Sequence, residues 1–357
     1  MKKLVSLVLG VSMVVSVGAG FTACEGKKER AFKNVIVVIG DGMGENHLLN
    51  AIEYFDLETP AFMEDQCGYI ATNSLSGTTD SAAAGTALAT GKKVENSNLA
   101  YYDEKNLTQI TTIAQKAKMK TGVVTTDTLD GATPAAFSAH SPTRSFTSQI
   151  ISTQVESGID LLLGRWSSTY TNRSYLFTDA EYTFTTTKED LLAAKDAPKL
   201  IGMVGDIDSQ YIAGNEEDFQ LKEMAQFAIE YLENDDGFFL MIEGAYIDKY
   251  SHNNQLTNAL SEARSLIDTV EYLYEYAADG ETAIFITADH ETGGLKKATS
   301  KAALTDALYV SSGHTSMPVP IFVKNYTWKP EKFGYKNGVT PENTMVFEAC
   351  KAIIQGK

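Results

Sequence analysis

Five short apolar runs recur along the chain, and each has the length and composition of a buried strand. The runs are Val35–Ile39, Gly122–Thr125, Phe238–Ile242, Ala283–Thr287 and Pro318–Val323. Their side chains lack the polar alternation of a half-exposed strand. We therefore predict that these segments form parallel strands buried on both faces of one sheet.

Segments between these runs carry apolar residues at intervals of three and four, which is typical of amphipathic helices. Predicted helices span Leu107–Lys118, Leu221–Leu232 and Leu256–Tyr274, and the last is the most regular. Because strands and helices alternate, the pattern predicts an α/β fold. Its core is expected to be an open, mostly parallel, doubly wound sheet with helices on both faces.

The N-terminus has the pattern of a secretory signal peptide, which we assign to residues 1–23. Two lysines precede the apolar run Leu4–Val17, which is too short and too interrupted for a good membrane span. The box from Phe21 to Cys24 resembles a bacterial lipoprotein cleavage site, which predicts a lipid anchor on Cys24; ordinary cleavage near Ala23 is the alternative. Either way, the protein is expected to be exported to the periplasm or the outer surface.

After this leader we predict a short tether, residues 24–33, and then one domain that spans residues 34–357. The alternation of strands and helices breaks over residues 145–215, which are rich in Thr, Ser, Tyr and Asp. We interpret that stretch as an insertion with mixed small elements.

The composition narrows the class of ligand. A chain of 357 residues with 43% hydrophobic content can bury a large core. Its 30 Lys and Arg residues against 46 Asp and Glu residues give a net charge of −16, which argues against nucleic acid as a dedicated partner. An anionic substrate would need a local positive site, for which bound metal ions are the simplest candidate. The 3 cysteines cannot build a disulfide framework, and the sequence leaves open whether Cys67 and Cys350 pair.

Acidic residues and histidines follow three of the predicted strands. They are Asp41, Glu243, Asp248, His252, Asp289 and His290. A single Asp after a strand is usually a helix cap or a turn former. The carboxyl ends of parallel strands share one edge, however, and carboxylates gathered there would repel one another unless cations lay between them. Carboxylate and imidazole groups suit catalytic zinc, and an oxygen-rich corner suits magnesium.

The remaining histidines divide into one candidate ligand and two ordinary residues. His314 lies in a polar turn, where a histidine is more often solvated; we interpret it as the third protein ligand of a zinc held by Asp248 and His252. We interpret His47 and His140 as hydrogen-bonded residues in or behind the site.

A candidate nucleophile opens an alanine-rich run. Ser81 precedes Ala82–Thr90, and Gly91 follows, which predicts a helix with Ser81 in its first turn and a glycine C-cap. An isolated serine there usually only caps the helix. Beside metal ions it becomes a nucleophile candidate, because a helix N-terminus attracts a phosphoryl group and a metal lowers the pKa of a hydroxyl. Arg144, otherwise an ordinary surface residue, could hold two phosphate oxygens at once.

These motifs together resemble the alkaline phosphatase family and occur in its order. The matching segments are Asp41–Gly44, Thr79–Ala83, Ala132–Ala136, Glu243–His252, Thr287–His290 and Gly313–Thr315. The resemblance implies an enzyme that hydrolyses small phosphate monoesters through a phosphoserine at Ser81, with Arg144 and Lys249 binding the substrate. It also implies a homodimer.

The resemblance further implies two zinc ions and one magnesium ion. The ligands of one zinc would be Asp248, His252 and His314, those of the other Asp41, Asp289 and His290, and those of magnesium Asp41, Thr133 and Glu243. Two departures from the family stand out. At the position of Gly131, two residues before Thr133, some members place an acidic or imidazole side chain. The chain is also short for the family, as expected of a form without a large crown insertion.

Other functions on the same scaffold remain open. A sulfatase would need Cys or Ser in a Cys/Ser-x-Pro-x-Arg setting, whereas three alanines follow Ser81. Phosphodiesterases of this superfamily usually carry Thr and lack the arginine and the third metal site, so Arg144, Thr133 and Glu243 favour monoesters. An exported protein that binds phosphate or metal without catalysis is the non-enzymatic alternative.

Overall fold

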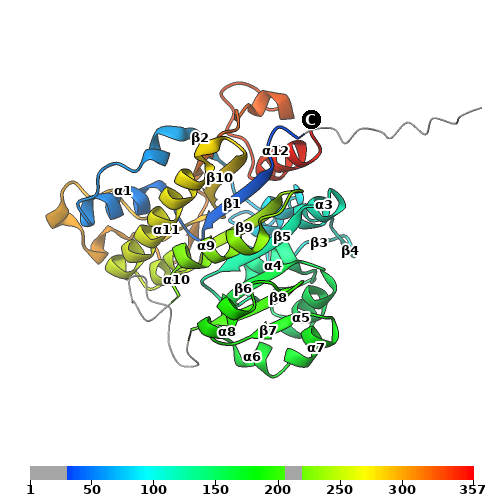
Figure 1. Ribbon diagram of the computed structural model, residues 1–357. Coiled ribbons are helices and arrows are strands. Elements are labelled where there is room, and N and C mark those ends of the chain that lie inside the picture. The colour runs from blue at the N-terminus through cyan, green and yellow to red at the C-terminus, as the bar shows by residue number, and fades with distance from the viewer. Residues whose placement is uncertain (1–29, 206–218) are drawn as a thin grey trace, which may run out of the picture.

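The computed structural model describes residues 30–205 and 219–357 (Figure 1). The predicted signal peptide, Cys24 and most of the predicted tether lie outside the described residues, as does the end of the predicted insertion. Among the described helices, none combines the length and the apolar character needed to cross a membrane.

A nine-stranded sheet forms the centre of the domain, in the order β2-β13-β10-β1-β9-β5-β6-β8-β7. Its strands are β1 (Asn34–Gly40), β2 (Gln66–Ile70), β5 (Lys120–Thr125), β6 (Leu161–Arg165), β7 (Thr183–Thr185), β8 (Leu200–Val204), β9 (Phe238–Gly244), β10 (Thr282–Ala288) and β13 (Val319–Lys324). Strand β1 is parallel to both of its neighbours, β9 and β10, and every residue of these three strands is buried. The predicted mostly parallel sheet is therefore confirmed.

The direction of β13 corrects the prediction of a fifth parallel strand. It runs antiparallel to both β10 and β2. After β10 the chain stays at the carboxyl edge of the sheet, where it forms the short strands β11 (Glu291–Thr292) and β12 (His314–Thr315). Because no crossover helix returns the chain to the opposite edge, β13 starts at the carboxyl edge and runs back.

Helices cover both faces of the sheet (Figure 1). One face carries α1 (Glu45–Tyr54), α9 (Leu221–Leu232), α10 (Tyr246–His252) and α11 (Leu256–Tyr276), and the other carries α2 (Ser81–Thr90), α3 (Ile110–Lys116), α4 (Ala132–Ser138) and α12 (Thr344–Ile354). The bounds of α9 are those of the helix predicted over the same residues. Helix α11 starts where predicted, at Leu256, and ends two residues later than predicted, at Tyr276. Helix α3 starts later than predicted because Leu107 N donates to Ala100 O beside the hairpin of β3 (Tyr101–Tyr102) and β4 (Lys105–Asn106).

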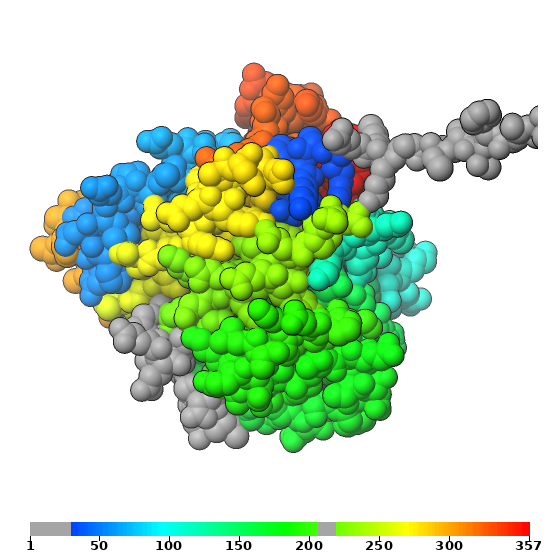
Figure 2. All heavy atoms as spheres, viewed as in Figure 1, coloured from blue at the N-terminus to red at the C-terminus, as the bar shows by residue number. Residues whose placement is uncertain are grey.

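The stretch that we interpret as an insertion contributes strands to the same sheet. Strand β6 pairs in parallel with β5, and β8 and β7 continue the sheet beyond it. The accompanying helices are α5 (Thr147–Glu156), α6 (Ser168–Thr171), α7 (Ser174–Asp179) and α8 (Lys188–Ala193). In the space-filling view this green segment forms the lower part of the molecule and packs directly against the yellow-green residues above it (Figure 2). The two cysteines of the described chain are free thiols: Cys67 is exposed and Cys350 is buried in α12.

Candidate active site

Three neighbouring strand ends bring the predicted acidic residues together. Strands β10, β1 and β9 are adjacent and parallel, so the residues that follow them meet at one edge. Asp41 follows β1 and donates its backbone N–H to Gly244 O at 3.0 Å. Gly42 N donates to Asp289 Oδ1 at 3.0 Å, which ties the end of β1 to the end of β10. The tertiary structure thus holds these carboxylates close together.

Asp248, His252 and His314 form the first ligand group. Asp248 and His252 lie one turn apart on α10 and therefore share a face. Asp248 Oδ1 is 3.3 Å from His252 Nε2 and 3.5 Å from His314 Nε2. The Nδ1 atoms of His252 and His314 contact Ser312 O at 2.6 Å and Thr79 O at 2.8 Å. Because a carbonyl oxygen accepts the Nδ1 proton, each Nε2 can present a lone pair to a cation.

A second ligand group surrounds His290, which is fully buried. His290 Nε2 is 3.1 Å from Asp289 Oδ2 and 3.6 Å from Asp41 Oδ1. Both of these carboxylate oxygens are buried and have no hydrogen-bond partner in the described part of the chain. Ligand atoms of Asp41, Asp248 and His290 also lie within 4.8 Å of one another, so Asp248 stands between the two groups. A bound cation would satisfy the unpaired oxygens.

Glu243 on β9 and Thr133 on α4, two elements that pack against each other, supply the remaining candidate oxygen ligands, which we call the oxygen-rich corner. Glu243 is the last residue but one of β9, is 1% exposed, and accepts a hydrogen bond from Thr125 Oγ1. Thr133 lies in the first turn of α4, is fully buried, and its Oγ1 has no partner among the described residues. Burial, followed by the charge of Asp127, raises the pKa of Glu243 to about 8. Burial, followed by the charges of Asp289 and Asp248, raises the pKa of Asp41 well above its ordinary value. This mutual repulsion is what bound cations would relieve.

Ser81 opens α2 and faces the second group. Its Oγ is 3.2 Å from His290 Nε2, and the residue is 4% exposed. The helix cap is Asp80, whose carboxylate accepts from Ala83 N at 3.0 Å, so Ser81 is placed for chemistry instead of capping. The predicted C-cap is observed, because Gly91 has a φ of 69°. The Ser81 hydroxyl thus lies at a helix N-terminus and beside the ligand cluster.

Asp80 also orients Arg144, a role that our sequence reasoning did not assign. Its Oδ2 lies 3.5 Å from Arg144 Nη1 and accepts from Ser97 N at 3.0 Å. Arg144 keeps 40% of its side chain exposed, so it remains accessible to a substrate. An aspartate immediately before a serine at a helix start was the signal available for its capping role. Its pairing with an arginine 64 positions away could not be read from the sequence.

Other supporting residues were also missed. Thr292 Oγ1 donates to Asp248 Oδ1 at 2.5 Å, and Lys249 Nζ donates to Asp127 Oδ1 at 2.5 Å. Neither Thr292 nor Asp127 belongs to a motif that sequence reasoning could single out.

The two histidines interpreted as ordinary residues have hydrogen-bond partners. His47 is buried; its Nδ1 accepts from Gly44 N at 3.1 Å, and its Nε2 contacts Ser251 Oγ at 3.0 Å. His140 Nδ1 donates to Ala100 O at 2.9 Å. These contacts agree with the structural role that we expected for both rings.

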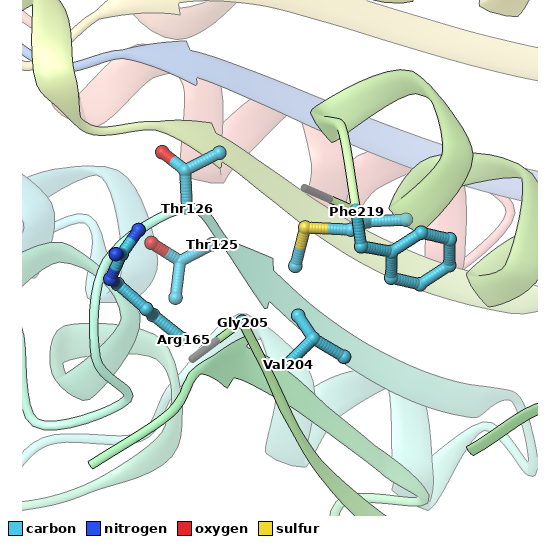
Figure 3. Close-up of a pocket in the computed structure, with 7 residues that line it drawn as sticks. Thr125, Thr126, Arg165, Val204, Gly205 and Phe219 are labelled. Carbon is cyan, nitrogen blue, oxygen red and sulfur yellow. The ribbon is translucent and has the colours of Figure 1, made fainter. Parts of the chain in front are cut away.

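A small pocket lies beside the Glu243 corner, next to the end of β5 (Figure 3). It is lined by Thr125, Thr126, Arg165, Val204, Gly205, Phe219 and Met224. Figure 3 shows Arg165 and the two threonines on one side of the space and Phe219 on the other. Gly205 and Phe219 flank residues 206–218, which the structure does not describe, so we assign this pocket no ligand.

Comparison with known proteins identifies relatives over most of the chain. The family model for alkaline phosphatase matches residues 32–161 and 172–352, which contain every candidate ligand and the candidate nucleophile. Alkaline phosphatase 4 of Bacillus subtilis (strain 168) is 34% identical over 295 residues, which cover 75% of this chain and 63% of that protein. The chain therefore spans less than two thirds of the length of this relative.

Solved structures agree with this relationship. The alkaline phosphatase from the Antarctic bacterium TAB5 has a TM-score of 0.79 and 27% identity, and the match covers 91% of this chain and 98% of that one. A variant of the same protein, in which a histidine is replaced by glutamate, has a TM-score of 0.77 and 26% identity over 91% of this chain and 99% of that one, and was solved with Mg bound in its M3 site.

Proposed function

This chain belongs to the alkaline phosphatase family, and we propose that it hydrolyses small phosphate monoesters to an alcohol and inorganic phosphate. One observation carries the proposal. The Ser81 hydroxyl lies at the N-terminus of α2 and 3.2 Å from His290, within a cluster of buried carboxylates in which Asp41 Oδ1 and Asp289 Oδ2 lack hydrogen-bond partners among the described residues. That combination supplies a nucleophile and the ligands of cations in one site.

We propose that the site holds two zinc ions and one magnesium ion. The ligands would be Asp248, His252 and His314 for one zinc, Asp41, Asp289 and His290 for the other, and Asp41, Thr133 and Glu243 for magnesium. The unpaired oxygens and the Nε2 atoms aimed inward fit this assignment, and the related TAB5 variant with Mg in its M3 site supports the magnesium. When bound, the cations would lower the pKa of the attacking hydroxyl and neutralise charge on the phosphoryl and alcohol oxygens.

Residues of the chain carry out the bond changes and hold the substrate. Ser81 Oγ forms a bond to phosphorus as the bond from phosphorus to the alcohol oxygen breaks, which gives a phosphoserine. Water then cleaves the phosphoserine and releases inorganic phosphate. The positive end of α2 faces the same point and favours a negatively charged phosphoryl group there. Because Ser81 is almost fully buried, bulk water is largely excluded from the reacting hydroxyl.

Arg144 and Lys249 are the proposed cationic contacts to the substrate. Arg144 is accessible, and Asp80 orients its guanidinium toward the start of α2. A planar guanidinium can bind two non-bridging phosphate oxygens at once. Lys249 directly follows Asp248 on α10; its ammonium pairs with Asp127, and 40% of its side chain is exposed, so the substrate would contact it from the open side.

The choice of ester tests this proposal. Purified protein should hydrolyse a chromogenic phosphate monoester much faster than the corresponding diester, with two zinc and about one magnesium per chain by elemental analysis. Arg144→Ala should reduce kcat/KM for the monoester by roughly 100-fold, because it removes charge-assisted bonds to two oxygens. Arg173→Ala, on α7's N-cap, is the matched control and should leave the rate unchanged. Equal or faster diester cleavage would identify a phosphodiesterase instead, and phosphate binding without turnover would identify a binding protein.

We also propose that the protein is exported and anchored by a lipid on Cys24, after removal of residues 1–23. In a bacterial host, the full chain should then fractionate with membranes and dissolve only in detergent. Cys24→Ser should release an exported, soluble protein, because it removes the atom that carries the lipid. A full chain that stayed in the cytoplasm with its leader intact would contradict this proposal.

A further inference from the structure

Gly131 stands two residues before Thr133, at the N-cap of α4. Its φ of −52° and ψ of 148° lie close to the extended region that any residue adopts, so the backbone does not require glycine here. A Cβ at this position would lie 2.7 Å from Asp127 Oδ2 and 3.0 Å from Thr128 O. The carboxylate of Asp127 therefore occupies the space that a side chain at position 131 would need.

Asp127 forms an ion pair with Lys249. Its Oδ1 accepts from Lys249 Nζ at 2.5 Å, and 20% of the Asp127 side chain is exposed. The ammonium of Lys249 also lies 4.5 Å from the centre of the Tyr246 ring, which fixes it from a second side.

A chain of hydrogen bonds joins this ion pair to the oxygen-rich corner. Asp127 N donates to Thr125 Oγ1 at 2.9 Å, and Thr125 Oγ1 in turn donates to Glu243. The ion pair is therefore linked to Glu243 through a single residue, Thr125. A charge left unbalanced at the pair would act on the corner that contains Glu243 and Thr133.

We propose that Asp127 is a positioning residue of the third cation site, where it takes the place of a side chain at position 131. From the end of β5 it holds the ammonium of Lys249 and neutralises that charge beside Glu243 and Thr133. The inference rests on the proposed function, because it needs a cation at that corner. Without Asp127, the unbalanced positive charge of Lys249 would oppose the binding of Mg²⁺.

Mg²⁺ binding to the zinc-loaded full-length protein tests the inference without measuring activity. Calorimetric titration with Mg²⁺ should give a dissociation constant about 10- to 100-fold higher for Asp127→Asn than for the wild type. The rise in Tm on adding Mg²⁺ should shrink in parallel. Glu348→Gln is the matched control, because it removes one carboxylate from the half-buried Lys351–Glu348 pair on α12, away from the candidate site. That control should bind Mg²⁺ as the wild type does.

Two rescue variants separate positioning from a general structural role. Adding Lys249→Met to Asp127→Asn removes the unbalanced charge, so most of the lost Mg²⁺ affinity should return. Exchanging the two positions, Asp127→Gly with Gly131→Asp, should also bind Mg²⁺ more tightly than Asp127→Gly alone, because the carboxylate then comes from the N-cap of α4.

An unchanged dissociation constant in Asp127→Asn would overturn this inference alone. So would a further loss on adding Lys249→Met, or an exchange variant no better than Asp127→Gly. A wild-type protein that bound no Mg²⁺ would overturn the proposed third cation site and this inference with it.

Discussion

Replacing Ser81 by alanine is expected to lower monoester turnover by on the order of 10⁴-fold or more, because the variant has no oxygen to form the phosphoserine. Bound zinc should be unchanged, since Ser81 is not among the proposed ligands. Initial rates with a chromogenic monoester, together with elemental analysis of the same sample, measure both quantities. Acid-quenched wild-type protein should also carry a phosphoryl group on Ser81, detectable by peptide mass spectrometry.

A matched control removes a hydroxyl from elsewhere in the fold. Ser261 lies on α11, and its hydroxyl donates only locally, to Thr257 O at 3.0 Å. Ser261→Ala should therefore keep full turnover. If Ser81→Ala retained turnover near that of the wild type with zinc still bound, the nucleophile would have to be another group, and the proposed mechanism would be wrong.

Removing the metal ions is expected to lower monoester turnover to a similar extent as the Ser81→Ala substitution. Protein stripped by a chelator should lose monoester turnover by roughly 10³-fold or more, because the cations contribute several kcal/mol of transition-state stabilisation. Adding zinc and magnesium back should restore the rate, and protein treated with metal-saturated chelator should keep it. Full turnover in a sample shown to be free of metal would refute the metal-dependent chemistry.

The stripped protein should also lose stability as the pH rises. Burial and then the charge of Asp127 raise the pKa of Glu243 from its ordinary 4.5 to about 8, and the hydrogen bond to Asp248 raises the pKa of His252 from 6.5 to about 9. At these two groups the folded, metal-free protein holds protons that the unfolded chain releases, and their contribution to stability falls as pH rises from about 4.5 through about 8 to 9. The lowered pKa of Asp248 acts in the opposite direction only below its ordinary value of 3.8, and the lowered pKa values of His47, His140 and His290 do so only below their ordinary value of 6.5.

Unfolding measurements on the stripped and the zinc-loaded protein can separate these effects. Between about pH 6.5 and pH 9 the stripped protein should unfold at progressively lower temperature as the pH is raised. The loaded protein should change much less, because bound cations keep the carboxylates ionised throughout that range. Parallel curves for the two samples would show that the cluster does not bind the cations.

Much of the fold could be predicted because its signals are local. The apolar runs that became β1, β9 and β10 and the periodicity of α9 and α11 depend only on neighbouring residues. The predicted direction of β13 was wrong, because a buried strand carries the same apolar pattern whether its neighbours are parallel or antiparallel.

The candidate site could be predicted in part for a related reason. Asp41 and Asp289 follow strands and Glu243 lies near the end of one, so a parallel sheet must bring them to one edge whatever the connecting helices do. The pairing of Asp80 with Arg144 and that of Asp127 with Lys249 could not be foreseen. Each joins residues from distant parts of the chain through side-chain positions that only the packed fold defines.

The sequence by itself determined which chemical groups this protein can use: carboxylates and imidazoles after strands, a serine at a helix start, and an excess of acidic residues that calls for bound cations. The tertiary structure alone decided which atoms face one another, such as Ser81 Oγ and His290 Nε2, and which carboxylate occupies the space beside Gly131. The physical reason is the distance along the chain over which each effect acts. Apolar periodicity and capping act over a few residues, whereas distances between side chains depend on the packing of every element between them.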